Sequence, residues 1–240
     1  MKIIFLNCWY GKVGKPFFDF VDDYLKDSDI CCLTEVNPEL HKKIGDKLTN
    51  FANFYQDGIY DPRLEVNFGQ SFFVKNDLNF KFIKKISAPI DPVEKLPFAF
   101  TTTYEVTLDN KKINIALVHG MALPGSKLDS LARLKQSDQI IEYMKGASGP
   151  QIVIGDFNLL PDTESIKKFE VYGYQNLIED FAIKSTRNRI AWEQFKNEPG
   201  FVKQHYADYC FVSKDVKVKM FTVPNIEVSD HLPLILEFEV

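Results

Sequence analysis

Residues 151–158 read Gln-Ile-Val-Ile-Gly-Asp-Phe-Asn, an apolar run that passes directly into glycine, aspartate and asparagine. A short apolar run bounded by turn-forming residues predicts a buried strand. Asp156 and Asn158 therefore stand where this strand ends. Their side chains either cap the turn or serve chemistry, because functional residues concentrate in loops that a rigid scaffold positions.

Polar residues also stand at the ends of other apolar, strand-like stretches. These residues are Asn7, Glu35, His119 and the adjacent pair Asp230 and His231. Each alone is explained equally well as a turn residue, a solvated charge or a hydrogen-bonded loop side chain. Their recurrence at one strand end after another is harder to explain separately, and it predicts a shared site.

Helices are predicted between these strands. Apolar residues recur at helical spacing from Phe17 to Leu25, residues 38–50 have a polar face, and an apolar stripe runs from Leu128 to Met144. Ser126 and Asp129 have the spacing of a pair that caps the start of the last of these helices.

Strands dominate the middle of the chain. Two hairpins are predicted, one joining Ala99–Leu108 to Lys112–Val118 and the other joining Tyr206–Val212 to Val216–Val223. Residues 232–240 alternate in polarity, so one face of this closing strand is expected to be buried. Ten or more strands are hard to hold in one open twisted sheet. We therefore expect an α/β layered domain with two sheets.

The composition bounds the class of protein. The chain has 240 residues, with 29 basic and 33 acidic side chains for a net charge of −4, and 45% of its residues are hydrophobic. These values exclude disordered, collagen-like and coiled-coil chains. No linker interrupts residues 1–240, which predicts a single domain. The mild acidity weighs against tight sequence-independent binding of nucleic acid, although a local basic patch is compatible with it.

The cysteines and the apolar segments indicate the cellular context. Buried free thiols are expected at Cys8, Cys31, Cys32 and Cys210, which all lie in apolar runs. No apolar stretch approaches the roughly 18 residues of a membrane span, and the N-terminus lacks the apolar core of an export signal. We expect a monomeric, cytoplasmic protein that does not act at a membrane.

The polar motifs, taken in order, resemble those of the endonuclease/exonuclease/phosphatase superfamily. The motifs are the Asn of Asn7, the Leu-Thr-Glu that ends at Glu35, the His of His119, the Gly-Asp-Phe-Asn of 155–158, the Asp-Tyr of 208–209 and the Ser-Asp-His of 229–231. The resemblance extends from Lys2 to Val240, with Thr34 where the family has Gln. It implies a four-layer α/β/β/α sandwich of two mixed, mainly antiparallel sheets flanked by helices. It also implies metal-dependent cleavage of a phosphoester.

The same residue types support a metal site on physical grounds. Carboxylates crowding an anionic phosphoester would repel it unless a cation lay between them, and Mg²⁺ prefers oxygen ligands. We expect Glu35 to be the primary metal ligand and Asn7 to contribute an amide oxygen directly or through water. Asp230 is expected to complete the group of residues around the metal. Mg²⁺ is the expected cofactor and Mn²⁺ its substitute.

The remaining motif residues have expected roles in catalysis. Asp156 is placed to act as a general base toward water, and Asn158 to donate its amide N–H to a phosphate oxygen. His231 serves as acid, base or charged phosphate contact. By resemblance, His119 donates to the phosphate or the leaving group, and Asp208 pairs with His231. Alternatively, Asp208 simply points outward from a strand.

A further motif distinguishes branches of the superfamily. Arg133 and Gln136 follow His119 in a pattern that resembles the deadenylase, sphingomyelinase and phosphodiesterase branches more than the apurinic endonucleases. Arg133 and Gln136 either support the site from beneath or lie on an exposed helix face.

Substrate choice is expected to depend on loops. Residues 184–204 interleave basic and aromatic side chains, among them Arg187, Arg189 and Trp192, that either contact bases and phosphates or pack on one another. Trp9 either flanks the pocket or packs. We expect a phosphodiesterase or nuclease acting on DNA or RNA. The alternative is a phosphatase or phosphodiesterase of a small phosphorylated metabolite or a lipid headgroup.

Overall fold

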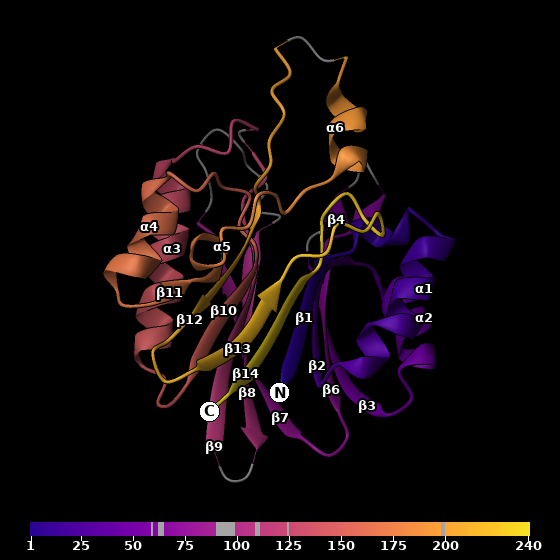
Figure 1. The fold of residues 1–240 in the computed structure, drawn as a ribbon, viewed down its shortest axis with the longest axis vertical. Coiled ribbons are helices and arrows are strands. Elements are labelled where there is room, and N and C mark those ends of the chain that lie inside the picture. Colours follow the sequence, from indigo (N-terminus) through magenta and orange to yellow (C-terminus); the bar gives the residue numbers. More distant parts are fainter. Residues whose placement is uncertain (59, 62–64, 90–98, 109–110, 124, 198–199) are drawn as a thin grey trace.

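Two six-stranded sheets packed face to face occupy the centre of the computed structural model (Figure 1). The structure describes residues 1–58, 60–61, 65–89, 99–108, 111–123, 125–197 and 200–240. The first sheet has the order β13 (Lys217–Thr222), β14 (Leu234–Glu239), β1 (Lys2–Asn7), β2 (Ile30–Val36), β6 (Gly69–Lys75) and β3 (Phe51–Gln56). The second has the order β11 (Gln175–Asn176), β12 (Asp208–Val212), β10 (Gln151–Asp156), β9 (Lys111–His119), β8 (Phe100–Leu108) and β7 (Asn79–Ser87). A small ribbon pairs β4 (Tyr60–Asp61) with β5 (Val66–Asn67).

Helices cover the outer face of each sheet and complete four layers (Figure 1). The first sheet carries α1 (Lys15–Asp23) and α2 (Pro38–Lys47), and the second carries α3 (Leu131–Lys145), α4 (Glu164–Val171) and α5 (Leu177–Asp180). Single 3₁₀ turns occupy Trp9–Gly11 (η1) and Leu25–Asp27 (η2), and α6 (Arg189–Phe195) projects from one end of the sandwich. The predicted α/β/β/α sandwich is confirmed. No helix among the described residues has the length and apolar character needed to cross a lipid bilayer.

Each sheet is built around one parallel pair of strands. β1 runs parallel to β2, and β9 runs parallel to β10, whereas the other pairs in the two sheets are antiparallel. The chain returns between the members of each pair through a helix, α1 in the first sheet and α3 in the second. This crossover places the carboxyl ends of both strands of a pair at the same edge, where functional loops of such folds gather.

The hydrophobic core lies between the sheets and under the helices. The ring of Phe72 on β6 stacks on that of Tyr104 on β8, with 3.8 Å between centroids, so the two sheets are joined by aromatic contact. Cys31 faces the helices and Cys32 faces the second sheet, as their alternation predicts. All four cysteines are buried and free, which confirms that prediction. The closing strand β14 buries Leu234, Leu236 and Phe238, which confirms its buried face.

The predicted hairpin of Tyr206–Val212 and Val216–Val223 is wrong. β12 belongs to the second sheet and β13 to the first, where β13 pairs with β14. β12 already bonds β10 along one edge and β11 along the other, so it offers no free edge to β13. The other predicted hairpin is confirmed by the pairing of β8 with β9, although residues 109 and 110 of its turn lie outside the described residues. Most of the loop predicted at residues 87–97 also lies outside them.

The start of α3 also differs from the prediction. Ser130 caps this helix through its hydroxyl, which accepts the Arg133 N–H at 3.2 Å, and Ser126 is not its cap. The Asp129 carboxylate instead accepts the N–H groups of Glu164 and Ser165 at the start of α4. Leu128 and Leu131, predicted to begin the apolar stripe, are exposed. The buried face of α3 begins instead at Ala132 and Arg133 and continues through Ile140, Ile141 and Met144.

Candidate active site

The polar residues at the strand ends meet at one edge of the sandwich. Asn7 ends β1, His119 ends β9 and Asp156 ends β10, and Glu35 is the residue before the last in β2. The two parallel pairs bring these four ends together, as the sequence predicted. Asn7, His119 and Asp156 are buried, and the Glu35 side chain is 17% exposed.

Glu35 is aimed into the site by an irregularity of β2. Its φ is +51°, in the left-handed region, and the register of β2 against β6 shifts between Thr34 and Val36. A left-handed conformation costs a residue with a Cβ about 1–2 kcal/mol, and bulges redirect side chains beside active sites. The strain at Glu35 therefore directs its carboxylate toward Asp156 rather than along the face of the sheet.

The Asn7 amide connects the two sheets. Its Nδ2 donates to Glu35 Oε1 and to Asp156 Oδ2, each at 3.0 Å. Its Oδ1 accepts the backbone N–H of Trp9 at 3.1 Å, which sets the orientation of the amide because only an oxygen can accept there. Asn7 thus presents N–H groups to the two carboxylates and orders them, while its role as a metal ligand stays a prediction.

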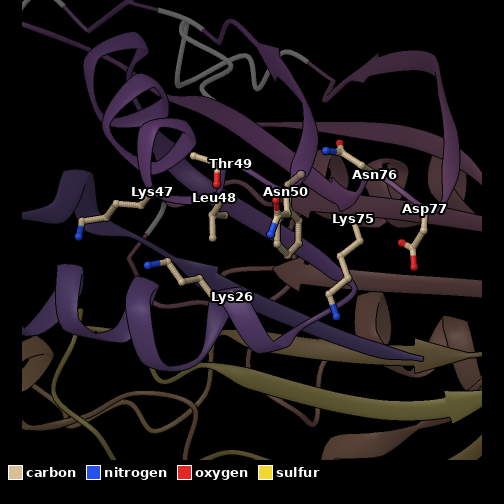
Figure 2. Close-up of a pocket in the computed structure, with 9 residues that line it drawn as sticks. Lys26, Lys47, Leu48, Thr49, Asn50, Lys75, Asn76 and Asp77 are labelled. Carbon is tan, nitrogen blue, oxygen red and sulfur yellow. The ribbon is translucent and has the colours of Figure 1, made fainter.

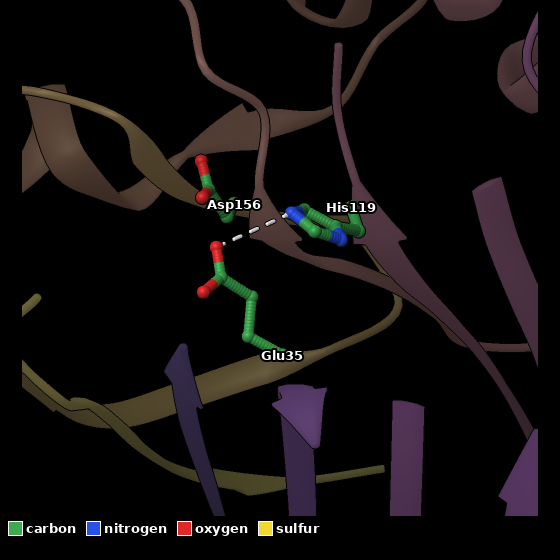
Figure 3. Close-up of side chains that lie close together, drawn as sticks. All are labelled: Glu35, His119 and Asp156. Atoms are coloured by element: carbon green, nitrogen blue, oxygen red, sulfur yellow. Dashed lines mark ion pairs between the residues drawn. The ribbon is translucent and has the colours of Figure 1, made fainter. Parts of the chain in front are cut away.

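Glu35, His119 and Asp156 form a group whose potential ligand atoms lie within 4.8 Å of one another (Figure 3). Burial, with the added repulsion of Asp230, raises the pKa of Glu35 to about 7. His119 Nε2 lies 3.7 Å from Glu35 Oε1, and no hydrogen-bond partner of the buried His119 Nδ1 is found in the described part of the chain. Carboxylates crowded in this way repel one another until a cation lies between them. The donor set therefore fits a hard divalent ion.

Asp230 faces the same region from the loop before β14. Its Oδ2 accepts from Arg187 Nη2 at 3.0 Å and from Gln194 Nε2 at 3.3 Å. The charge of Asp230 raises the pKa of Glu35, but neither group of closely spaced ligand atoms found among the described residues includes Asp230. Of its two oxygens, Oδ2 is held by Arg187, and Oδ1 faces the Ser229 hydroxyl at 3.3 Å.

His231 and Asp208 form the pair that the resemblance implied. His231 Nδ1 lies 2.9 Å from both oxygens of Asp208, and both residues are buried. Burial alone would lower the pKa of His231, but the Asp208 carboxylate and two further aspartates outweigh it and raise that pKa to about 9. His231 Nε2 points toward Asp156, 3.8 Å from Oδ2. The outward alternative for Asp208 is wrong, and His231 is an imidazolium at neutral pH in this structure.

Asp156 and Asn158 are ordered as one unit. The Asn158 backbone N–H donates to Asp156 Oδ1 at 2.9 Å, and Asn158 adopts a left-handed φ of +54°. Burial favours the neutral form of Asp156, but the cationic His231 and Lys127 outweigh it and lower the pKa of Asp156. Asp156 is thus a carboxylate near neutral pH, as a general base requires.

Lys127 belongs to the site although no sequence pattern identified it. Its Nζ donates to Asn158 Oδ1 at 2.6 Å, and only 5% of the residue is exposed. Lys127 lies in the loop between β9 and α3, and a lysine in a polar loop is ordinarily solvated. Its burial could not be predicted from the sequence because the contact joins residues 31 positions apart.

Arg133 and Gln136 support the site from below. Arg133 donates through Nη1 to the Leu128 carbonyl at 2.6 Å and through Nη2 to the Met121 carbonyl at 2.9 Å. Gln136 Nε2 donates to the His119 carbonyl at 3.4 Å. Both side chains are buried, so the alternative of an exposed helix face is wrong. They hold the end of β9 and the loop that contains Lys127.

The predicted substrate loop reaches Asp230 through Arg187 and Gln194. Arg187 bonds Asp230 and forms an isolated bridge with His231, so the loop is attached to both residues. Arg189 instead pairs with Glu227 on the surface. Trp192 packs on His205 and lies beneath Lys203, whose Nζ is 3.5 Å from the ring centroid. The loop therefore packs its own aromatic residue and also brings one arginine into the site.

Trp9 lies immediately beyond Asn7 in η1. Its backbone N–H binds the Asn7 amide, and its ring is covered by Lys12 Nζ at 4.7 Å from the centroid. Trp9 is partly exposed, so the structure leaves it at the margin of the site rather than in the core.

A recess of about 610 Å³ lies at the other end of the first sheet (Figure 2). It lies beside the start of β3 and the end of β6, and none of the candidate site residues lines it. Its three lysines have acidic partners, since Lys26 and Lys47 pair with Asp22 and Lys75 pairs with Asp29. The three lysines share two carboxylates, and the residues that line the recess include no histidine.

Comparisons with known proteins agree with this architecture. The model of the endonuclease/exonuclease/phosphatase family matches residues 5–231. No curated protein sequence matches the chain. A mannosyl-6-phosphatase of Bacteroides thetaiotaomicron is similar in structure, with a TM-score of 0.73 at 17% identity, covering 100% of both chains.

Two further solved structures share the fold. The catalytic domain of human Nocturnin, solved with a bound sulfate anion, has a TM-score of 0.72 at 21% identity over 100% of this chain and 94% of its own. TDP2 of D. rerio, solved with a single-strand DNA product, has a TM-score of 0.71 at 16% identity over 100% of this chain and 99% of its own. At these identities the likeness extends to the fold alone.

Proposed function

The chain belongs to the endonuclease/exonuclease/phosphatase family, and we propose that it is a Mg²⁺-dependent phosphodiesterase that cleaves nucleic acid. Its family makes it a phosphoester hydrolase. The observation that carries the finer proposal is the meeting of His231, paired with Asp208 at 2.9 Å, and the Asp156 carboxylate. A protonated imidazole and an ionised carboxylate side by side provide an acid and a base at one place.

The acidic side chains are the proposed metal ligands. Glu35 has a raised pKa and a partly exposed side chain, which suit it to exchange a proton for a cation, and the charge of Asp230 adds to the negative potential there. The ion supplies charge that neutralises the phosphate oxygens. Mg²⁺ is proposed because the acidic donors are oxygen atoms, and Mn²⁺ takes the same ligand types.

Four side chains of the chain have separate proposed roles in hydrolysis. Asp156 orients a water molecule and accepts its proton, and Asn158 and His119 donate to the phosphoryl oxygens. His231, cationic at neutral pH, donates to the phosphate or the leaving oxygen. General acid–base contributions of this kind are typically about 10²–10⁴-fold each.

A nucleic-acid substrate is supported by the groups around the site. Arg187 enters from the loop that also contains Trp192 and Lys203. Trp9, just beyond the end of β1, is covered by Lys12. Aromatic rings beside cationic side chains suit bases and phosphates. The TDP2 structure with a single-strand DNA product shows that the same fold accepts a DNA strand in another protein.

A small phosphorylated molecule is the second candidate. The net charge of −4 provides no general attraction for a polyanion, and the similar Bacteroides protein is described as a mannosyl-6-phosphatase. Arg189, which we predicted to bind substrate, is occupied by Glu227.

A substrate panel with Mg²⁺ or Mn²⁺ separates the two candidates. We expect cleavage of labelled single-stranded DNA or RNA and of bis(p-nitrophenyl) phosphate, and slower release of phosphate from sugar phosphates and p-nitrophenyl phosphate. Asp156→Asn, folded to the same degree, is the matched inactive control. Turnover confined to the monoesters contradicts the proposal and favours the second candidate.

A further inference from the structure

Lys127 is a buried cation that no expected role explains. It ends the loop that follows β9, with a left-handed φ of +55°, and its carbonyl accepts the Leu160 N–H at 2.9 Å. Burying an ammonium group is costly unless it is paired. A lysine that is 95% buried and has a strained backbone is therefore a candidate for a functional contact.

The group that receives this hydrogen bond is the Asn158 amide. Asn158 Oδ1 accepts from Lys127 Nζ at 2.6 Å, and Asn158 Nδ2 donates to the Gly120 carbonyl at 3.3 Å. A side-chain amide can rotate by half a turn and exchange its oxygen and nitrogen, but an ammonium group can only donate. Lys127, together with the Gly120 carbonyl, which can only accept, therefore determines which end of the Asn158 amide is oxygen.

The charges around Lys127 keep it in place. The carboxylates of Asp156, Asp208 and Asp230 attract its ammonium group, while burial and Arg187 oppose it and lower the pKa of Lys127 to about 8. The nitrogen is thus held within the charge network of the site and hydrogen-bonded to one neutral acceptor. No carboxylate among the described residues bonds it directly.

We propose that Lys127 is a positioning residue that holds the Asn158 amide with its free N–H directed at the phosphoryl oxygen. The inference rests on the proposed phosphoester chemistry of this site. The Asn158 amide has two N–H bonds, and the Gly120 carbonyl takes one of them. No other acceptor for Nδ2 is found in the described part of the chain, so the second N–H is available to substrate while Oδ1 faces Lys127.

A double-mutant cycle tests whether Lys127 acts through Asn158. Hydrolysis of bis(p-nitrophenyl) phosphate with Mn²⁺ is measured for wild type, Lys127→Met, Asn158→Ala and the double variant. We expect Lys127→Met to lower kcat about 10- to 100-fold with little change in KM. In the Asn158→Ala background the same substitution is expected to change kcat by less than about twofold. Lys135→Met, an exposed lysine of α3, is the matched control. An equal loss in both backgrounds overturns the proposal.

A second measurement needs no turnover. In ¹⁵N-labelled protein the Asn158 side-chain amide resonances are those lost in Asn158→Ala. We expect them to be resolved and slow to exchange with water in wild type, and to broaden or exchange faster in Lys127→Met. Unchanged resonances in a folded Lys127→Met protein overturn the proposal even if wild type cleaves no phosphoester tested.

A third variant covers a failure of Lys127→Met to fold. Lys127→Gln keeps an N–H donor on a side chain that is one atom shorter and can also accept, so we expect its Asn158 amide exchange and its kcat to lie between those of wild type and Lys127→Met. If Lys127→Gln is folded and shows rapid exchange with full kcat, the orientation of the amide does not matter and the proposal is wrong.

Discussion

Glu35 has a strained backbone conformation that places its side chain in the site. Its left-handed φ of +51° interrupts β2, and the interruption turns a strand residue inward to meet Asp156. Strained residues cluster at functional sites because the surrounding structure holds them there. The sequence predicted Glu35 as a ligand from its place after an apolar run, but the bulge itself has no sequence signature here.

Removal of the Glu35 charge is the first residue-level prediction. Glu35→Gln keeps the shape of the side chain but loses the charge of the carboxylate. We expect weaker binding of Mn²⁺ and a turnover rate that is roughly 100- to 1000-fold lower, because the activation free energy rises by several kcal/mol. Calorimetric titration and initial rates check this. Glu39→Gln, an exposed glutamate of α2, is the control and should behave as wild type. Unaltered metal affinity in Glu35→Gln would show that another residue holds the ion.

His231 gives the second residue-level prediction. His231→Ala removes the imidazolium beside Asp156, so we expect turnover to fall by about 10²–10⁴-fold with a much smaller change in metal affinity. Initial rates at saturating Mn²⁺, with affinity measured in parallel, separate the two effects. Full activity in His231→Ala would remove this residue from the mechanism.

At the scale of elements, α4 depends on a residue outside it. Asp129 accepts the first two N–H groups of α4, and its other contact is the Ser165 hydroxyl at 2.5 Å. The first N–H groups of a helix lack partners within the helix. The Asp129 carboxylate thus links the loop after Lys127 to the helix after Asn158 and stabilises both flanks of the site.

Loss of this link should destabilise the protein. Asp129→Ala is expected to lower the free energy of unfolding by about 1 kcal/mol, as for other helix caps. Denaturant titration measures it. Asp162→Ala, whose side chain is 99% exposed, is the control for removal of a nearby acidic charge. Equal midpoints for the two variants would mean that α4 needs no cap from Asp129.

His41 gives a pH-dependent prediction for the packing of α2 on the first sheet. Its ring nitrogens lie 2.9 Å from Ser71 Oγ and 3.1 Å from Asn53 Oδ1, and burial lowers the pKa of His41 below its usual value. Below about pH 6.5 the unfolded chain takes up a proton that the folded chain resists. Stability that depends on His41 is therefore present above that pH and declines as the pH falls.

The comparison that checks this uses His41→Gln, which keeps a donor and an acceptor without titrating. Denaturant midpoints are measured for wild type and variant at about pH 7.5 and about pH 5.5. We expect the denaturant midpoint of wild type to exceed that of His41→Gln by a smaller amount at the lower pH than at the higher pH. An advantage that grows on acidification would contradict the lowered pKa of His41.

At the scale of the whole molecule, we expect catalysis to require that the two sheets stay packed face to face in one relative position. Asn7 and Glu35 come from the first sheet, and His119 and Asp156 come from the second. The hydrogen bonds of Asn7 to carboxylates from both sheets are possible only while the sheets remain packed. The stack of Phe72 on Tyr104 is part of that packing.

Removing a ring from this interface tests the coupling. Phe72→Ala is expected to cost about 3–5 kcal/mol because it opens a cavity between the sheets. Far- and near-ultraviolet circular dichroism should report one coincident transition. Phe195→Ala, whose ring is 43% exposed, should stay within about 0.5 kcal/mol of wild type. Separate transitions in Phe72→Ala would mean that each sheet folds by itself.

The local sequence pattern was sufficient to predict most of the helices and strands and the polar residues at their ends. Apolar runs and helical periodicity predicted the strands that end at Asn7, Glu35 and Asp156, and the order of motifs predicted the layered fold and the partner of His231. These features depend on neighbours in sequence or on residue types that recur through the family, so they are visible before folding.

Tertiary structure alone decided the contacts that join distant segments. It placed β13 beside β14 because β12 had no free edge, attached Arg187 to Asp230, and buried Lys127 against Asn158. Whether a lysine is solvated or buried depends on the carboxylates around it in space, and its own sequence neighbours carry no information about them. A strand's partner depends likewise on which edges earlier pairings leave open.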